Sequence, residues 1–320
     1  MSPADQEIDR PAVLLMAYGA PQRLDQVEAY YTDIRRGVPP PPDRLEALLD
    51  RYRAIGGRSP LADLVEGQRA ALASQLAARG APIPVYAGMR HSEPRIGRAV
   101  HRMAADGVTR AVAIALAPQR SSNGAGYRLA VEAAAAALGG RAPQVTFVES
   151  WHDQPRFIEA LAQATADALA GVPNPAAALV IFTAHSLPSR AVDAGDRYPA
   201  EVARTAQLVA RRLGLEHWRV AYQSAGRTAE AWLGPDLRDE MRRAAADGVT
   251  QLVVCPVGFV TDHLEVLYDI DIEARAVADE LGVRLERARS LNADPTFIAG
   301  LADLVANALA GSADPIVSTP

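Results

Sequence analysis

Hydrophobic residues in this chain occur in short continuous runs that alternate with longer amphipathic stretches. The clearest runs span residues 12–17, 111–117, 179–184 and 252–257. Short continuous apolar runs are typical of strands buried on both faces, and the longer stretches between them have the pattern of helices. The chain is therefore predicted to be an α/β protein whose parallel sheets are flanked by helices.

Several segments occur twice along the chain, in the same order. The string AADGVT at residues 104–109 recurs at 245–250, and an apolar run follows each copy. The strand-like segments 145–149 and 283–286 each lead through an aspartate and a proline into an alanine-rich helix that ends in Ala-Leu-Ala-Gly. Such strings are common in alanine-rich proteins, but their preserved order indicates a duplicated unit.

The duplication predicts two similar Rossmann-like domains, residues 1–171 and 172–320, with a cleft between them. In parallel sheets, ligands bind outside the carboxyl ends of the strands. Residues that directly follow the apolar runs are therefore expected to border the cleft: Tyr18, Gln119, His185 and Phe259.

Composition narrows the class of function. The net charge is −5, which argues against nucleic acid as a partner, because a phosphate backbone requires clustered basic residues. The single cysteine, Cys255, permits neither an intramolecular disulfide nor a cysteine-ligated cluster. No apolar run is long enough to span a membrane, and residues 1–10 lack the features of a secretory signal. We expect a cytoplasmic protein without an integral membrane segment.

Three histidines compete as candidate chemical groups: His91, His185 and His263. A histidine at the end of a strand is more often a hydrogen-bonded structural residue than a ligand or a base. His185 is the strongest candidate, because it follows a strongly apolar strand and precedes a turn of small residues that would present its ring to the cleft.

Glu265, Asp269 and Glu273 form a second candidate group. Their spacing of i, i+4 and i+8 would stack the three carboxylates on one face of an α-helix. One interpretation is a solvated face whose charges are balanced by cationic residues from elsewhere. The other is a path that passes a divalent cation toward the cleft, since carboxylate oxygens and imidazole are suitable ligands for such ions. Glycine-rich nucleotide-binding loops, a hydrolase nucleophile motif and an HExxH zinc motif do not occur in the chain.

Taken together, the motifs resemble those of the ferrochelatases, and more closely the coproporphyrin type than the protoporphyrin type. The resemblance extends nearly from end to end. It is carried by MAYGAP at 16–21, YYTDIRRG at 30–37, RY at 51–52, IGGRSPL at 55–61, AHSLP at 184–188, WLGPD at 232–236, and PVGFV at 256–260 with DHLE at 262–265. Residues 118–126 depart from the pattern of the family.

The resemblance implies a chelatase fold with a porphyrin cleft in which His185 and Glu265 form a facing metal-site pair. Asp269 and Glu273 would be an outer acidic line that relays metal, and Tyr18 would ligate the iron of the product. The residues expected to hold the macrocycle and its carboxylates are Arg35, Arg51, Tyr52, Ser59 and Tyr127.

The expected activity is the insertion of Fe²⁺ into coproporphyrin III to give Fe-coproporphyrin (coprohaem) in haem biosynthesis. With an ordinary pKa of about 6.5, His185 is suited to accept a pyrrole proton, while Glu265 orients it or holds Fe²⁺. Fe²⁺ is a substrate, no cofactor or [2Fe–2S] cluster is expected to be bound permanently, and the partners are the porphyrin, Fe²⁺ and haem-pathway enzymes. We expect a monomer. The alternatives are a protoporphyrin IX ferrochelatase, a carrier that binds porphyrin without catalysis, and a chelatase for Co²⁺ or Ni²⁺.

Overall fold

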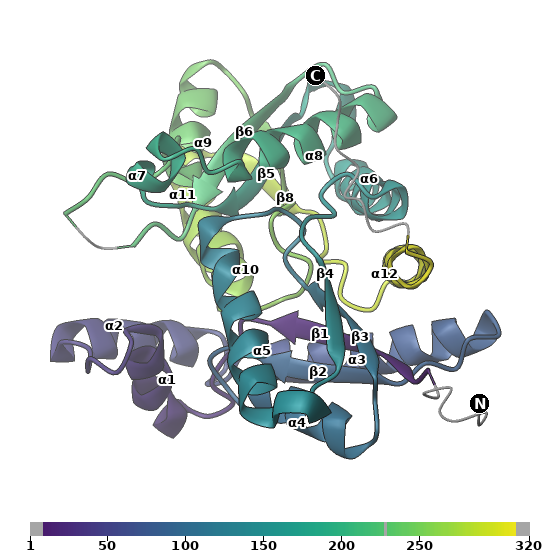
Figure 1. The fold of residues 1–320 in the computed structure, drawn as a ribbon. Coiled ribbons are helices and arrows are strands. Elements are labelled where there is room, and N and C mark those ends of the chain that lie inside the picture. The colour runs from purple at the N-terminus through teal and green to yellow at the C-terminus, as the bar shows by residue number, and fades with distance from the viewer. Residues whose placement is uncertain (1–8, 227–228, 312–320) are drawn as a thin grey trace, which may run out of the picture.

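The computed structural model describes residues 9–226 and 229–311, and it contains two four-stranded parallel sheets (Figure 1). The first sheet has the order β2-β1-β3-β4, with β1 at Pro11–Ala17, β2 at Val85–Met89, β3 at Arg110–Ala115 and β4 at Gln144–Val148. The second has the order β6-β5-β7-β8, with β5 at Leu179–His185, β6 at Trp218–Gln223, β7 at Gln251–Cys255 and β8 at Arg284–Arg287. The α/β class is confirmed, and the shared strand order matches the repeats in the sequence.

The central strands form because their side chains are apolar on both faces. In β1, Val13 pairs with Val85 on one side and with Val112 on the other, and all three side chains are buried. Helices cover both faces of such a sheet, so continuous apolar runs replace the alternation of a half-exposed strand. Cys255 is the last residue of β7 and a fully buried core side chain, and burial raises the pKa of its thiol to about 12.

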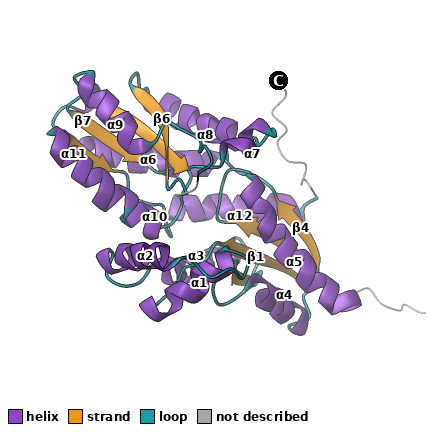
Figure 2. Cartoon of the chain, turned by 90° about the vertical axis from the view of Figure 1, so that its left-hand side faces the viewer, coloured by secondary structure: helices purple, strands orange, loops and turns teal. Residues whose placement is uncertain are grey.

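Helices occupy the segments between the strands (Figure 2). In the first half they are α1 (Val27–Ile34), α2 (Pro42–Ala54), α3 (Leu61–Ala78), α4 (Ile96–Ala105), α5 (Ala125–Leu138) and α6 (Pro155–Ala170). In the second half they are α7 (Ser189–Asp193), α8 (Tyr198–Leu213), α9 (Leu237–Ala246), α10 (Leu264–Leu267), α11 (Arg275–Leu281) and α12 (Pro295–Leu309). Among the described residues, no helix has the length and apolar character needed to cross a bilayer. The expectation that residues 1–10 carry no secretory signal concerns a segment of which residues 1–8 lie outside the described part of the chain.

The last helix of each half packs against the other half. α6 contacts α8 and β7 of the second half, whereas α12 contacts α3 of the first and runs between the two layers (Figure 2). Both helices begin with proline after a capping side chain: Gln154 accepts from the Phe157 amide, and Asp294 accepts from the Phe297 amide. The cap places each phenylalanine in the core, where the Phe157 and Phe297 rings both lie near Trp151. The two sheets therefore share one hydrophobic core between them.

The acidic segment does not form the regular α-helix that the sequence predicted. After α10 the chain continues as a π-helix, η5, over Asp269–Ala274, in which the Glu273 amide donates to the carbonyl of Tyr268. A π-turn widens the helix, so the i, i+4 stacking holds at Glu265 and Asp269 but not onward to Glu273. Asp269 is buried, whereas Glu273 lies nearer the surface.

Candidate active site

A cavity of about 1390 Å³ lies between the two halves. Its wall is formed by α1, α2 and the carboxyl ends of β1 and β3 from the first half, and by the segments after β5 and β7 from the second. The predicted rim residues Tyr18, Gln119, His185 and Phe259 all line it. Sites for drug-sized ligands measure roughly 300–1,000 Å³, so this cavity suits a larger molecule.

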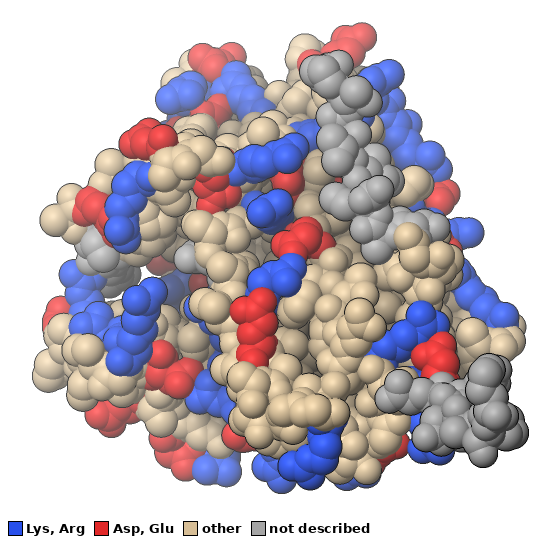
Figure 3. All heavy atoms as spheres, in the orientation of Figure 1, with Lys and Arg blue, Asp and Glu red and all other residues tan. Residues whose placement is uncertain are grey.

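The lining of the cavity is strongly basic. Among the described residues it includes the arginines Arg35, Arg44, Arg51, Arg90, Arg120, Arg128 and Arg197, but only the acids Glu149, Asp196 and Glu265. The hollow is visible at the left of Figure 3, with basic side chains beside its opening. The chain contains no lysine, so all these cations are guanidinium groups, which pair bidentately with carboxylates. The negative net charge of the whole chain gave no sign of this local concentration.

His185 and Glu265 face each other in the cavity. Nε2 of His185 lies 3.5 Å from Oε1 of Glu265, and both side chains remain partly exposed. Nδ1 of His185 donates to the backbone carbonyl of Ser186, which fixes the ring so that Nε2 points to the carboxylate. Gln223 holds the backbone of Glu265 by donating to its carbonyl oxygen. The structure thus brings together the pair predicted from the sequence.

The pair carries opposite charges in the ligand-free protein. Burial alone would lower the pKa of His185, but the neighbouring charge and hydrogen bond of Glu265 outweigh it and raise the pKa to about 9. For Glu265, burial works to raise the pKa, and the charge of His185 nevertheless holds it well below its ordinary range. At neutral pH the pair is an imidazolium beside a carboxylate. The expected neutral His185 with an ordinary pKa is therefore not the resting state, and its proton must leave before Nε2 can accept another or bind a metal.

His263 is a third member of this group. It was one of the three candidate histidines in the sequence, but the pattern favoured His185. Its Nε2 lies 3.7 Å from Oε2 of Glu265, and its Nδ1 donates to the backbone carbonyl of Thr261. The two oxygens of Glu265 thus each face an imidazole. The described residues nevertheless contain no group of three or more His, Cys, Asp or Glu arranged to hold a metal ion. The motif DHLE pointed to His263, because this histidine comes two residues before Glu265 at the start of a short helix, where both side chains lie close together.

Tyr18 lies in the wall formed by the first half, where its side chain is 40% exposed. The ring of His91 packs against it at 4.6 Å between centroids, and Nδ1 of His91 lies 2.6 Å from Oδ2 of Asp33. Burial, followed by the charge of Glu265, raises the pKa of Tyr18 to about 12. Tyr18 is therefore a neutral phenol at neutral pH unless a cation approaches it.

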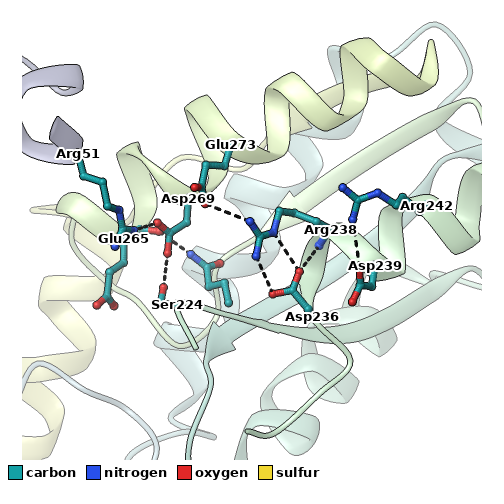
Figure 4. A network of polar contacts seen from close by, with 10 residues as sticks. Arg51, Ser224, Asp236, Arg238, Asp239, Arg242, Glu265, Asp269 and Glu273 are labelled. Carbon is teal, nitrogen blue, oxygen red and sulfur yellow. Dashed lines mark hydrogen bonds and ion pairs between the residues drawn. The ribbon is translucent and has the colours of Figure 1, made fainter. Parts of the chain in front are cut away.

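Asp269 is already paired through both of its carboxylate oxygens. Oδ1 of Asp269 accepts from Nη2 of Arg51, and Oδ2 accepts from the hydroxyl of Ser224 (Figure 4). Glu273 lies farther along, with Oε2 3.6 Å from Nη1 of Arg238. Asp269 and Glu273 do not line the cavity, and each has a cationic partner from another element, but Asp269 is buried and so does not lie on a solvated face.

The other residues predicted to hold a macrocycle differ in position. Arg35, Arg51, Tyr52 and Tyr127 line the cavity. Ser59 does not: it is 3% exposed, and its hydroxyl accepts from the Leu61 amide before α3. Contact between Ser59 and a bound molecule would require this turn to move.

Comparisons with known proteins agree with this geometry. The family model described as Ferrochelatase matches residues 10–309. A ferrochelatase of Thermus thermophilus is 46% identical over 311 residues, covering 92% of this chain and 98% of its own. A coproporphyrin III ferrochelatase of Geobacillus thermodenitrificans is 44% identical, covering 94% of this chain and 97% of its own.

A solved structure supports the fold independently. SirB from Bacillus subtilis with Fe³⁺ superposes with a TM-score of 0.59 at 14% sequence identity, over 94% of this chain and 98% of its own. At this identity the likeness concerns the arrangement of the two sheets and not the ligand.

Proposed function

Because this chain belongs to the ferrochelatase family, we propose that it inserts Fe²⁺ into coproporphyrin III to give Fe-coproporphyrin, with release of the two pyrrole protons. One observation carries the proposal: a large cavity lined by arginines contains an imidazole and a carboxylate that face each other, His185 and Glu265.

The arginine lining favours coproporphyrin III over protoporphyrin IX. Coproporphyrin carries four propionates and protoporphyrin two, and each buried carboxylate requires a cationic or hydrogen-bonding partner. We assign the macrocycle and its propionates to Arg35, Arg51, Tyr52 and Tyr127, with Tyr18 facing the iron of the product; Ser59, which does not line the cavity, is left out of this assignment. Relatives named coproporphyrin III ferrochelatase, 42–44% identical, support this substrate.

Metal insertion requires the pyrrole nitrogens to lose their protons while the ion sheds water. A flat macrocycle keeps the nitrogen lone pairs in its plane, and bending exposes them. Binding energy from remote propionates is suited to impose such strain, on the order of 1–5 kcal/mol. Because His185 starts as an imidazolium, its first proton must pass to Glu265 or to water before Nε2 takes a pyrrole proton. Glu265 then orients His185 or contacts Fe²⁺, and Asp269 and Glu273 form the outer part of the metal path.

The remaining features of the proposal follow from the same assignment. Fe²⁺ is a substrate, and the protein holds no permanent cofactor or cluster. We place the enzyme in the cytoplasm as a monomer of two domains, residues 1–171 and 172–320, acting with other enzymes of haem biosynthesis.

The test is a parallel insertion assay. Purified protein is supplied anaerobically with Fe²⁺ and with either coproporphyrin III or protoporphyrin IX, and metalloporphyrin formation is followed by absorbance. We expect faster turnover with coproporphyrin III and at least a 100-fold loss in His185→Ala, in the range typical for loss of a general base.

The alternatives give different results in the same assay. Tight porphyrin binding without insertion would identify a carrier. Preference for protoporphyrin IX would overturn the substrate assignment, and insertion of Co²⁺ or Ni²⁺ but not Fe²⁺ would overturn the choice of metal.

A further inference from the structure

An ion pair connects the two halves beside the metal-site pair. Arg51 comes from α2 in the first half, and Asp269 lies in the π-helix of the second, 218 residues away (Figure 4). Asp269 is 6% exposed, and its second oxygen is occupied by the hydroxyl of Ser224. Ser224 has a φ of 61°, a left-handed conformation that is unusual outside glycine. Both oxygens of Asp269 are therefore occupied in this state.

Arg51 is not fully satisfied by this arrangement. Its Nε is buried and has no hydrogen-bond partner among the described residues, although buried N–H groups are normally paired. The guanidinium also lies 4.7 Å from the centre of the Tyr268 ring, and the side chain lines the cavity. Arg51 thus contacts both the cavity and the acidic segment, and its Nε–H group is still available to donate a hydrogen bond.

We propose that a substrate carboxylate and Asp269 compete for Arg51, so that porphyrin binding releases Asp269 to contact the incoming cation beside Glu265. This inference rests on the proposed function and concerns how its two substrates are coupled. In this scheme Asp269 acts on the porphyrin only through Arg51, and its carboxylate becomes available to the cation only when Arg51 turns to the substrate.

The physical basis is the cost of a buried, unpaired charge. When Arg51 turns toward a propionate, Asp269 keeps only the hydrogen bond from Ser224, and a buried carboxylate with so little compensation takes up a proton or a cation. The coupling is reciprocal, so a cation at Asp269 must tighten porphyrin binding by the same factor. The ion is then held firmly only when a macrocycle is present to receive it.

The porphyrin side of the coupling is measured by the fluorescence of metal-free coproporphyrin III. Asp269→Asn removes the competing charge, so we expect the variant to bind the porphyrin about 3- to 30-fold more tightly than wild type. In an Arg51→Ala background, Asp269→Asn should have no effect. The tetramethyl ester of coproporphyrin III, which has no carboxylate, should bind wild type and Asp269→Asn alike.

The metal side is measured by anaerobic calorimetry with Fe²⁺ and no porphyrin. Arg51→Ala should bind Fe²⁺ more tightly than wild type, and the gain should disappear in Arg51→Ala/Asp269→Asn. This double variant separates release of Asp269 from the simple loss of a positive charge. Arg53→Ala is the matched control, because Arg53 lies on the same helix but is exposed and pairs with Glu46 and Asp50. Arg51→Gln, which removes the charge but keeps a long side chain, replaces Arg51→Ala if that variant does not fold.

The effect of Asp269→Asn on porphyrin binding distinguishes competition for Arg51 from a purely structural ion pair. If the ion pair only holds Arg51 in place for the substrate, Asp269→Asn will weaken porphyrin binding or leave it unchanged, and the inference is overturned. That result can occur in a wild-type enzyme that metallates coproporphyrin III normally, so it leaves the proposed function standing. A wild-type protein that inserts no metal would instead overturn the proposed function.

Discussion

Nε2 of His185 points at Oε1 of Glu265 across 3.5 Å, while Nδ1 of the same ring is held by the carbonyl of Ser186. With Nδ1 fixed as a donor, Nε2 is the nitrogen that exchanges protons with the cavity. The carboxylate decides its protonation, because burial by itself would favour the neutral ring.

The pKa of His185 depends on Glu265. In wild type it should titrate near pH 9, and in Glu265→Gln it should fall below the ordinary 6.5, because burial persists without the compensating charge. Histidine ring signals followed by NMR against pH measure both values, with His185→Ala identifying the resonance. A value near 9 in Glu265→Gln would show that another group holds the proton.

The same pair predicts how stability varies with pH. A folded-state pKa of about 9 against an unfolded value near 6.5 means that His185 contributes stability that is fully present below pH 6.5 and is lost as the pH rises through 9. Glu265 has a lowered pKa, so its contribution is present above about pH 4.3 and is lost as the pH falls through its folded value. Urea unfolding of wild type and Glu265→Gln should therefore differ most between about pH 4.3 and 6.5, and progressively less toward pH 9. A difference independent of pH would contradict the ion pair.

The sequence was sufficient for the repeated α/β architecture, because the apolar runs and the amphipathic stretches that follow them occur twice in the same order. It also pointed to His185, which ends a strongly apolar strand, and to Glu265, which begins the acidic spacing and belongs to the family motif DHLE. It could not give the partner of Asp269. Arg51 and Asp269 are 218 residues apart, and nothing in the local pattern of α2 distinguishes Arg51 from its exposed neighbour Arg53.

Two other features depended on tertiary structure. The α-helix expected from the acidic spacing became a π-helix after Tyr268, which preserves the apolar contacts of Ile270 and Ala274 with the core of the second half. Ser59 belongs to a motif typical of the family, yet it is buried and does not line the cavity. Motif membership alone does not show which side chains reach the surface of a site.

Gly126, in the first turn of α5, leaves room for the guanidinium of Arg90 beside the cavity. A Cβ at this position would overlap the guanidinium of Arg90, which lies near the rings of Tyr18 and Tyr127. Because an arginine side chain has several rotatable bonds, the guanidinium of Arg90 should move while the backbone stays in place. Gly126→Ala should therefore keep or slightly raise the thermal midpoint, as glycine replacements in helices usually do, and weaken coproporphyrin III binding about 10-fold.

The control for this variant is Gly97→Ala on the neighbouring helix α4. Its Cβ would meet Ala134 at 3.7 Å, an ordinary contact away from Arg90. Gly97→Ala should leave porphyrin binding unchanged. Equal binding by wild type and Gly126→Ala, measured by porphyrin fluorescence, would exclude a role for the position of Arg90.

Phe297 packs where the two halves meet, so its removal should lower the stability of both halves together. It lies on α12 with 1% of its surface exposed, and its ring centroid lies 5.8 Å from that of Trp151 and 6.3 Å from that of Phe157 on α6. Phe297→Ala leaves a cavity where α6 and α12 meet, so the free energy of unfolding should fall by about 3–5 kcal/mol. Because α12 packs against the first half and α6 against the second, we expect one cooperative transition in urea, monitored by tryptophan fluorescence and circular dichroism. Leu129→Ala, at an exposed position on α5, should leave the transition nearly unchanged. Two separate transitions in Phe297→Ala would show that each half is stable without the helix it receives from the other.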